Sequence, residues 1–289
     1  MTKCFGAVRA LDALDLDVPA GGVVGYLGPN GSGKSTTLRI LVDLSRADSG
    51  DVRVLGESPR CAGPGLRRRI GYLPGELRLD ERLTVEETLR FWATLRGGVD
   101  RPYVEELCAR LDLDLGRATK GLSSGNRRKV GLVGAFMARP DLLILDEPTS
   151  GLDPLVQEEF LHLAEEVRAD GRTIFLSSHV LSEVQRVADH VIVLRAGRVV
   201  ATGDVADLRH RASQPFTVWF RSTPPLDELR AVPGVRDVDV RGNEVSGIVD
   251  DEPTGLLAVL GRHPVDHVLF PEPDLEQAFL RFYESEEGR

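Results

Sequence analysis

The sequence is poor in cysteine, in tryptophan and in long apolar runs. Its 289 residues include two tryptophans and three cysteines, and Cys4, Cys61 and Cys108 do not have the spacing of a metal-binding cluster. Scattered cysteines in odd number, without a secretory segment, argue against a disulfide framework and indicate reduced thiols in the cytoplasm. The longest apolar runs, such as Leu142 to Leu145, are far shorter than the roughly 20 residues needed to cross a bilayer. We therefore expect any membrane role to depend on a partner.

The chain lacks an excess of positive charge. The chain has 36 Lys and Arg against 45 Asp and Glu, a net charge of −9. No global basic field attracts nucleic acid or anionic lipid, although a local basic patch could do either. We expect no nucleic-acid partner. The length allows one α/β domain of about 200 residues and a smaller domain, each with its own core.

One segment reads as strand, glycine-rich loop and helix. Apolar Val23 to Leu27 leads into the loop, and Thr37 to Val42 has a helical pattern. The loop itself consists of Gly28, Pro29, Asn30, Gly31, Ser32, Gly33, Lys34, Ser35 and Thr36. It satisfies GxxxxGK[ST], in which backbone N–H groups wrap phosphates because glycine permits the turns and the close approach. In this pattern Lys34 pairs with the β and γ phosphates of a nucleotide, and the Ser35 hydroxyl binds Mg²⁺.

A pair of carboxylates follows a buried strand. Asp146 and Glu147 come directly after the apolar run Leu142 to Leu145. The carboxyl ends of parallel strands are where α/β sheets hold their ligands. Together with the phosphate loop, this position predicts that Asp146 holds Mg²⁺ through water and that Glu147 polarises the attacking water.

Apolar periodicity predicts the remaining elements of the first domain, residues 1–212. Alternation over Ala7 to Val18 and the stretch Ser49 to Leu55 predict strands of a small antiparallel β layer. Thr84 and Glu87 form a capping box for a helix that reaches Leu95. Further parallel strands are predicted at Thr173 to Ser177 and at His190 to Leu194.

The pattern breaks around Arg211 to Pro215, and residues 213–289 read as a small α+β domain. The break is followed by strand-like alternation at Val235, Val238 and Val240 and by a turn at Gly242-Asn243. A last helix is predicted from an N-cap at Asp274, with Gln277 reaching back to it. The apolar face of that helix consists of Leu275, Ala278, Phe279 and Phe282.

Over roughly residues 3 to 210, the sequence resembles the ATP-binding subunits of ABC (ATP-binding cassette) transporters. Five motifs carry the resemblance, and they occur in the family's order. They are Walker A (Gly28 to Thr36), the signature (Leu122, Ser123, Ser124, Gly125 and Asn126), Walker B (Leu142 to Glu147), the D-loop (Ser150, Gly151, Leu152 and Asp153) and the switch histidine (His179). The resemblance implies a P-loop NTPase fold, with a RecA-like α/β core, an antiparallel β layer and an α-helical subdomain at about residues 76–125.

The resemblance also implies roles for residues outside the phosphate loop. Ser123 and Gly125 precede a helical run, so their hydroxyl and N–H groups can bind an anion; in the family this anion is the γ-phosphate of the opposite subunit's ATP. His179 would contact the γ-phosphate and help organise the water. Phe5 stands where the family places an aromatic that stacks on adenine, with simple core packing as the alternative.

The sequence departs from the family at Ile70 to Gly75, a phrase that usually ends in a glutamine that binds Mg²⁺ and senses the membrane partner. Here that position is Gly75. Glu76 follows, and the sequence leaves two interpretations open: an oxygen ligand for Mg²⁺ or a solvated loop residue.

The implied function is ATP binding and hydrolysis, with ATP and Mg²⁺ held between two subunits in a head-to-tail dimer. The implied partners are integral membrane permease subunits, which would place the chain at the cytoplasmic face of the cell membrane. The phrase Tyr72 to Glu76 and the extra C-terminal domain resemble the branch that exports drugs, lipids or polyketide antibiotics. Two alternatives are a soluble ABC ATPase that acts on ribosomes or DNA, and a degenerate cassette that binds ATP without hydrolysing it.

Overall fold

The computed structural model describes residues 1–205, 214–250 and 253–271. Contacts divide the chain into two compact units, Met1–Thr202 and Gly203–Arg289. The sequence predicted the boundary between the domains after residue 212, ten residues later than the division by contacts. Residues 206–213, around that predicted boundary, lie outside the described residues. The helix predicted from Asp274 also lies outside them.

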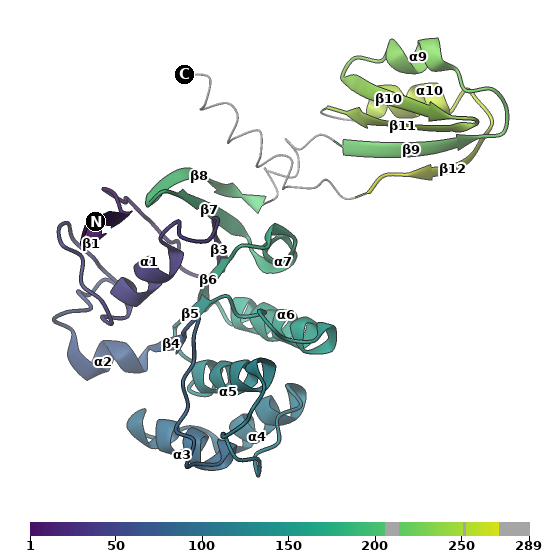
Figure 1. Cartoon of the computed structure of the whole chain (residues 1–289). Coiled ribbons are helices and arrows are strands. Elements are labelled where there is room, and N and C mark those ends of the chain that lie inside the picture. The colour runs from purple at the N-terminus through teal and green to yellow at the C-terminus, as the bar shows by residue number, and fades with distance from the viewer. Residues whose placement is uncertain (206–213, 251–252, 272–289) are drawn as a thin grey trace. The chain divides into compact units, whose positions relative to one another are not determined.

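A six-stranded sheet forms the centre of the first unit (Figure 1). Its strands, in spatial order, are β4 (Ile70–Leu73), β5 (Leu142–Asp146), β6 (Thr173–Ser178), β3 (Val23–Leu27), β7 (His190–Arg195) and β8 (Arg198–Asp204). The pairings from β4 to β7 are all parallel. β3, β5 and β6 are buried along their whole length, which explains why they read as continuous apolar runs.

Helices cover both faces of this sheet. They are α1 (Lys34–Leu41), α2 (Gly63–Arg68), α5 (Ser124–Phe136), α6 (Pro154–Ala169) and α7 (Leu181–Val187). Neighbouring residues of a strand point to opposite faces. On β3, the Tyr26 hydroxyl lies 3.1 Å from that of Thr37 in α1, whereas a Cβ at Gly25 would collide with Val184 of α7. α1 and α7 therefore cover opposite faces.

Two more helices, α3 (Val85–Leu95) and α4 (Arg101–Arg110), fall within residues 76–125, the region expected to form the helical subdomain. Both lie beside α5 (Figure 1). The predicted capping box starts α3: the Glu87 N–H donates to Thr84 Oγ1 at 3.2 Å, and the Thr84 N–H donates to Glu87 Oε2 at 2.8 Å. This prediction is confirmed.

The antiparallel β layer is smaller than the sequence predicted. It consists of β1 (Lys3–Phe5) and β2 (Val8–Leu11). The predicted strand over Ser49 to Leu55 is wrong, because this stretch makes only isolated bridges. Positive φ angles at Gly50 (89°) and Leu55 (50°) reverse the chain and prevent a continuous ladder.

The second unit contains a four-stranded antiparallel sheet in the order β10-β11-β9-β12. Its elements in chain order are β9 (Gln214–Phe220), α9 (Leu226–Arg230), β10 (Val235–Arg241), β11 (Glu244–Val249), α10 (Thr254–Leu260) and β12 (Val265–Leu269). This βαββαβ order is a ferredoxin-like arrangement. The turn at Gly242-Asn243 separates β10 from β11, as the sequence predicted.

Candidate functional site

The phosphate loop lies between β3 and α1. Gly33 has φ 112°, and a Cβ there would lie 2.6 Å from the Ala10 carbonyl oxygen, so only glycine fits against β2. The Lys34 ammonium group donates to the carbonyl oxygens of Gly28 at 2.6 Å and Pro29 at 3.3 Å. The Ser32 Oγ is buried and has no hydrogen-bond partner among the residues that the structure describes. A buried hydroxyl without a partner is costly, so the loop fits an anionic ligand that supplies the missing bond.

Two carboxylates face Lys34. Its Nζ lies 3.8 Å from Glu147 Oε1. Burial lowers the pKa of the Lys34 ammonium, and the negative charges of Glu147 and Asp146 oppose that shift. The site thus holds a buried cation at the phosphate loop beside two anions at the end of β5.

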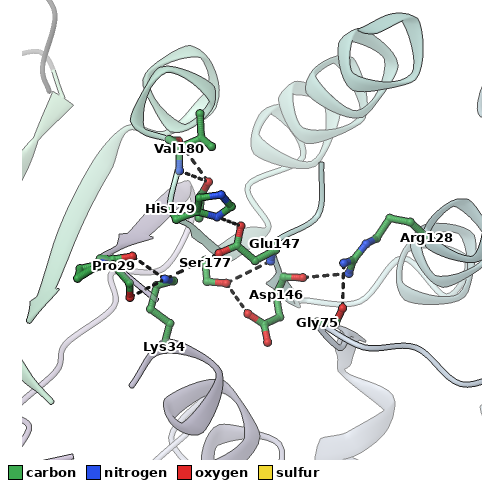
Figure 2. A network of polar contacts seen from close by, with 11 residues as sticks. Pro29, Lys34, Gly75, Arg128, Asp146, Glu147, Ser177, His179 and Val180 are labelled. Carbon is green, nitrogen blue, oxygen red and sulfur yellow. Dashed lines mark hydrogen bonds and ion pairs between the residues drawn. The ribbon is translucent and has the colours of Figure 1, made fainter. Parts of the chain in front are cut away.

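Asp146 is positioned by the neighbouring strand. It pairs with Ser177 in the parallel register of β5 and β6, and the Ser177 hydroxyl donates to Asp146 Oδ1 at 2.6 Å (Figure 2). The Glu147 N–H lies 3.1 Å from the same hydroxyl oxygen. Ser177 was not among the residues predicted for the site, although a serine near the end of a buried apolar strand is a signal that could have found it.

Glu147 and His179 meet at the carboxyl ends of β5 and β6. His179 Nδ1 lies 2.7 Å from Glu147 Oε2 (Figure 2). Glu147 has φ 53°, a left-handed conformation that is strained for a residue with a side chain, by about 1–3 kcal/mol. Such strain is concentrated at functional sites. The two oxygens of the Glu147 carboxylate have different partners: Oε1 lies near Lys34, and Oε2 contacts His179.

Arg128 of α5 ties the loop after β4 to the end of β5. Its guanidinium group donates to the carbonyl oxygens of Gly75 at 2.9 Å and Asp146 at 3.1 Å (Figure 2). It also donates to the carbonyl oxygen of Pro74 at 2.9 Å. Burial lowers the pKa of Arg128. Arg128 was not predicted as a site residue, because its partners lie 18 to 54 positions away in the sequence.

Gly75 lies against Asp146, since a Cβ at Gly75 would be 2.8 Å from Asp146 Oδ2. The glycine leaves space beside this oxygen. Glu76 has a different environment: its side chain is 72% exposed, and its Oε1 binds Arg78 at 3.1 Å. The structure therefore places Gly75 in the site and gives Glu76 an ion pair on the surface.

The signature begins α5. Ser123 is the N-cap, and its Oγ accepts from the Asn126 N–H at 3.2 Å. Leu122 is buried, whereas Ser123 and Ser124 are exposed. A Cβ at Gly125 would lie 2.6 Å from the Gly151 carbonyl oxygen, so the signature packs against the D-loop of the same chain.

The D-loop leads from Glu147 into α6. Asp153 is the N-cap of that helix, and its Oδ1 accepts from the Val156 N–H at 3.1 Å. Leu152 is buried and Ser150 is exposed. Gly151 has φ 76°, which turns the chain between them.

Phe5 makes no described contact with the phosphate loop or with the carboxylates of the site. It ends β1, is 55% exposed, and has Lys3 Nζ 5.3 Å from its ring centroid. The core-packing alternative is therefore wrong for this ring, and adenine stacking stays a prediction.

The donors for a metal ion are few. No group of three or more His, Cys, Asp or Glu residues that could hold a metal occurs in the described ranges. Ser35, in the first turn of α1, and Asp146, at the end of β5, are the residues that would supply oxygen atoms for the metal ion. This set fits Mg²⁺, which keeps several waters and takes one or two protein ligands together with substrate phosphates.

Comparisons with known proteins agree with this geometry. The family described as ABC transporter matches residues 11–150. The daunorubicin/doxorubicin resistance ATP-binding protein DrrA of Streptomyces peucetius is 38% identical over 214 residues, which are 72% of this chain and 65% of that protein, just under two thirds. The Nod factor export ATP-binding protein I of Cupriavidus metallidurans is 33% identical over 287 residues, covering 96% of this chain and 94% of that protein.

Solved structures agree as well. An ATP-binding subunit of an ABC transporter is 33% identical, with a TM-score of 0.66, and covers 72% of this chain and 89% of that one. A dimeric ATP-binding cassette bound to ADP and Pi, 23% identical with a TM-score of 0.63, covers 71% and 95% and shares the fold. No helix in the described part of the chain combines the length and the hydropathy needed to span a bilayer. The chain belongs to the ABC transporter family, among its ATP-binding subunits.

Proposed function

We propose that this chain binds ATP with Mg²⁺, hydrolyses it, and drives export of a drug-, lipid- or antibiotic-like substrate through separate integral membrane permease subunits. The convergence of Lys34, Glu147 and His179 carries the proposal. Lys34 Nζ and His179 Nδ1 lie 3.8 Å and 2.7 Å from the two oxygens of one carboxylate, at the mouth of a phosphate loop. The names of relatives that confer daunorubicin resistance, transport bacitracin or export Nod factor support the substrate class.

The chemistry needs each of these groups. Lys34 and the loop N–H groups offset the charge of the β and γ phosphates, and bound Mg²⁺ would neutralise charge that develops on the phosphate oxygens. Ser35 would hold the metal ion directly, and Asp146 would hold it through water. Glu147 orients the attacking water, and His179 keeps the Glu147 carboxylate in place and contacts the γ-phosphate.

A second copy of the chain completes the site. The exposed Ser123 and Ser124 at the start of α5 present a hydroxyl, N–H groups and the positive end of a helix dipole. In a head-to-tail dimer these groups bind the γ-phosphate held by the other subunit's phosphate loop. ATP then joins the halves, and hydrolysis releases them. We place the assembly at the cytoplasmic face of the membrane, where motion passes to the permease.

ATP binding tests the first step of the proposal. Lys34→Ala removes the cation that offsets two phosphates, and truncation of one partner of such a pair costs about 2–5 kcal/mol, which is at least roughly 30-fold in Kd. Calorimetric titration with ATP measures the change, with the exposed Arg82→Ala as control. Equal ATP affinity in wild type and Lys34→Ala would exclude the assigned role of this loop.

Export is tested in the assembled complex. An integral membrane protein should co-purify with the tagged chain, and its substrate should raise ATP turnover in the reconstituted complex. Association with ribosomes or DNA in place of a membrane protein would refute the transporter assignment. ATP binding without turnover would support the degenerate cassette.

A further inference from the structure

A hollow of about 460 Å³ with a mixed polar and apolar lining lies outside the nucleotide site, in the segment between α1 and α2. Arg46, Arg53 and Arg60 line it, all three exposed. None of the three has an ion-pair partner within the part of the chain that the structure describes. In a chain with net charge −9, most other exposed arginines face a carboxylate, so three unpaired ones around one hollow need an explanation.

We propose that this hollow binds a phosphate-bearing anion, either a free phosphorylated small molecule or the headgroup of an anionic lipid. Like charges around one hollow repel one another, and a bound anion relieves that repulsion. The planar guanidinium fork matches phosphate oxygens and binds them in a bidentate manner. The volume lies in the range of about 300–1,000 Å³ that is usual for small-molecule sites.

The charge balance of the lining favours an anion. Asp43 and Asp51 also line the hollow, but Asp43 is bound to Arg67, with 3.1 Å between Oδ2 and Arg67 Nη2. Within the described residues, three arginines without an ion-pair partner therefore line the hollow together with one such aspartate, Asp51. This balance disfavours a divalent cation.

Hydrogen bonds hold the backbone next to Arg53 and Arg60, although this backbone belongs to no strand or helix. Beside Arg53, Val54 is buried, and its N–H donates to the Glu57 carbonyl oxygen at 2.8 Å. Next to Arg60, the Cys61 N–H donates to the Ser58 carbonyl oxygen at 3.0 Å. A fixed backbone reduces the entropy lost when the arginine side chains bind a ligand.

A cysteine at the same hollow supplies a local readout. Cys61 lines the hollow and is exposed, whereas Cys4 is half-buried and Cys108 is buried. Burial raises the pKa of the Cys108 thiol to about 11, so this residue reacts slowly with alkylating agents near neutral pH. A ligand in the hollow should shield Cys61 and leave the rate at Cys4 unchanged.

The test measures alkylation of each cysteine in the full chain by N-ethylmaleimide and peptide mass spectrometry. The probes are inorganic pyrophosphate, with sodium chloride of equal ionic strength as control, and phosphatidylcholine vesicles with or without phosphatidic acid. At a pyrophosphate concentration about ten times its Kd, Cys61 should react about tenfold more slowly. Protection by phosphatidic acid vesicles alone would identify the lipid headgroup as the source of the anion.

Matched variants locate the effect. Arg46→Gln combined with Arg53→Gln should abolish protection, whereas Arg117→Gln combined with Arg230→Gln removes the same charge from exposed positions elsewhere and should preserve it. Protection must also survive Lys34→Ala, which separates the hollow from the phosphate loop. If the double variant does not fold, the single Arg53→Gln variant replaces it, and protection of Cys61 should then be weakened. Absence of protection by both probes, equal protection in both double variants, or loss of protection in Lys34→Ala would each overturn the proposal.

Discussion

The two larger sheets of this chain, one in each unit, distribute their polar side chains in different ways. The central strands of the first unit are parallel and buried on both faces, so their polar groups gather at the carboxyl ends, as Asp146 and Ser177 do. The second sheet is antiparallel and alternates: Phe216 and Val218 face a core with the helices, whereas Trp219 lies on the other face and donates to Glu244 Oε2 at 2.9 Å.

This difference explains where the candidate chemistry lies. Parallel strands bring the ends of distant segments to one edge, so that a few polar residues converge on a single ligand. An antiparallel sheet with one covered face spreads its polar residues over the other face. All motif residues accordingly belong to the first unit, and the second has a separate core around Phe216.

The largest effect is expected for Glu147→Gln. This change removes the water-orienting carboxylate but keeps the shape of the side chain and the phosphate loop. Steady-state hydrolysis should fall by about 10²–10⁴-fold, while ATP affinity stays unchanged and an ATP-stabilised dimer accumulates in gel filtration. Glu165→Gln, an exposed glutamate of α6, is the control. Near wild-type turnover in Glu147→Gln would show that the assignment of this residue is wrong.

The next largest effect is expected on the stability of one unit at a time. Phe216→Ala should destabilise the second unit by about 3–5 kcal/mol, because it removes a fully buried ring and leaves a cavity. ATP affinity should not change. Phe175→Ala removes a buried ring beside Tyr26 in the first unit. This change should destabilise the first unit and weaken ATP binding, and it should leave the second unit as stable as in wild type. Differential scanning calorimetry and ATP titration measure both outcomes, and loss of ATP binding in Phe216→Ala would show that the two units depend on each other.

The sequence was sufficient for features that are encoded locally. The phosphate loop, the capping box at Thr84 and the buried strand before Asp146 each depend on a few consecutive residues. Ser177 and Arg128 were missed because their roles arise only when segments distant in sequence pack together. The prediction of a strand over Ser49 to Leu55 failed because the apolar pattern does not reveal where the backbone reverses, as it does at Gly50 and Leu55.

A smaller effect is expected for Arg128→Ala. The change removes three hydrogen bonds that hold the Pro74 and Gly75 carbonyls beside Asp146. Turnover should fall about tenfold, or about 1.4 kcal/mol of barrier, with ATP binding changed little. Arg128→Lys should not restore it, because a single ammonium group cannot reproduce the guanidinium fork. Initial-rate kinetics measure kcat and KM, with the exposed Arg168→Ala as control; a change confined to KM would contradict a role in positioning Asp146.

The smallest effect is expected for Glu76→Ala, and it decides between the two interpretations that the sequence left open. The Glu76 side chain is 72% exposed and engaged with Arg78, and an exposed ion pair contributes about 0–1 kcal/mol. We therefore expect turnover within about twofold of wild type, with the same dependence on Mg²⁺ concentration. Arg78→Ala is the matched control, because it breaks the same pair from the other side and should behave alike. A tenfold loss in Glu76→Ala alone, with a higher Mg²⁺ requirement in the isolated subunit, would instead make Glu76 a metal ligand. If the loss appears only in the complex with the permease, Glu76 acts in coupling to the membrane partner.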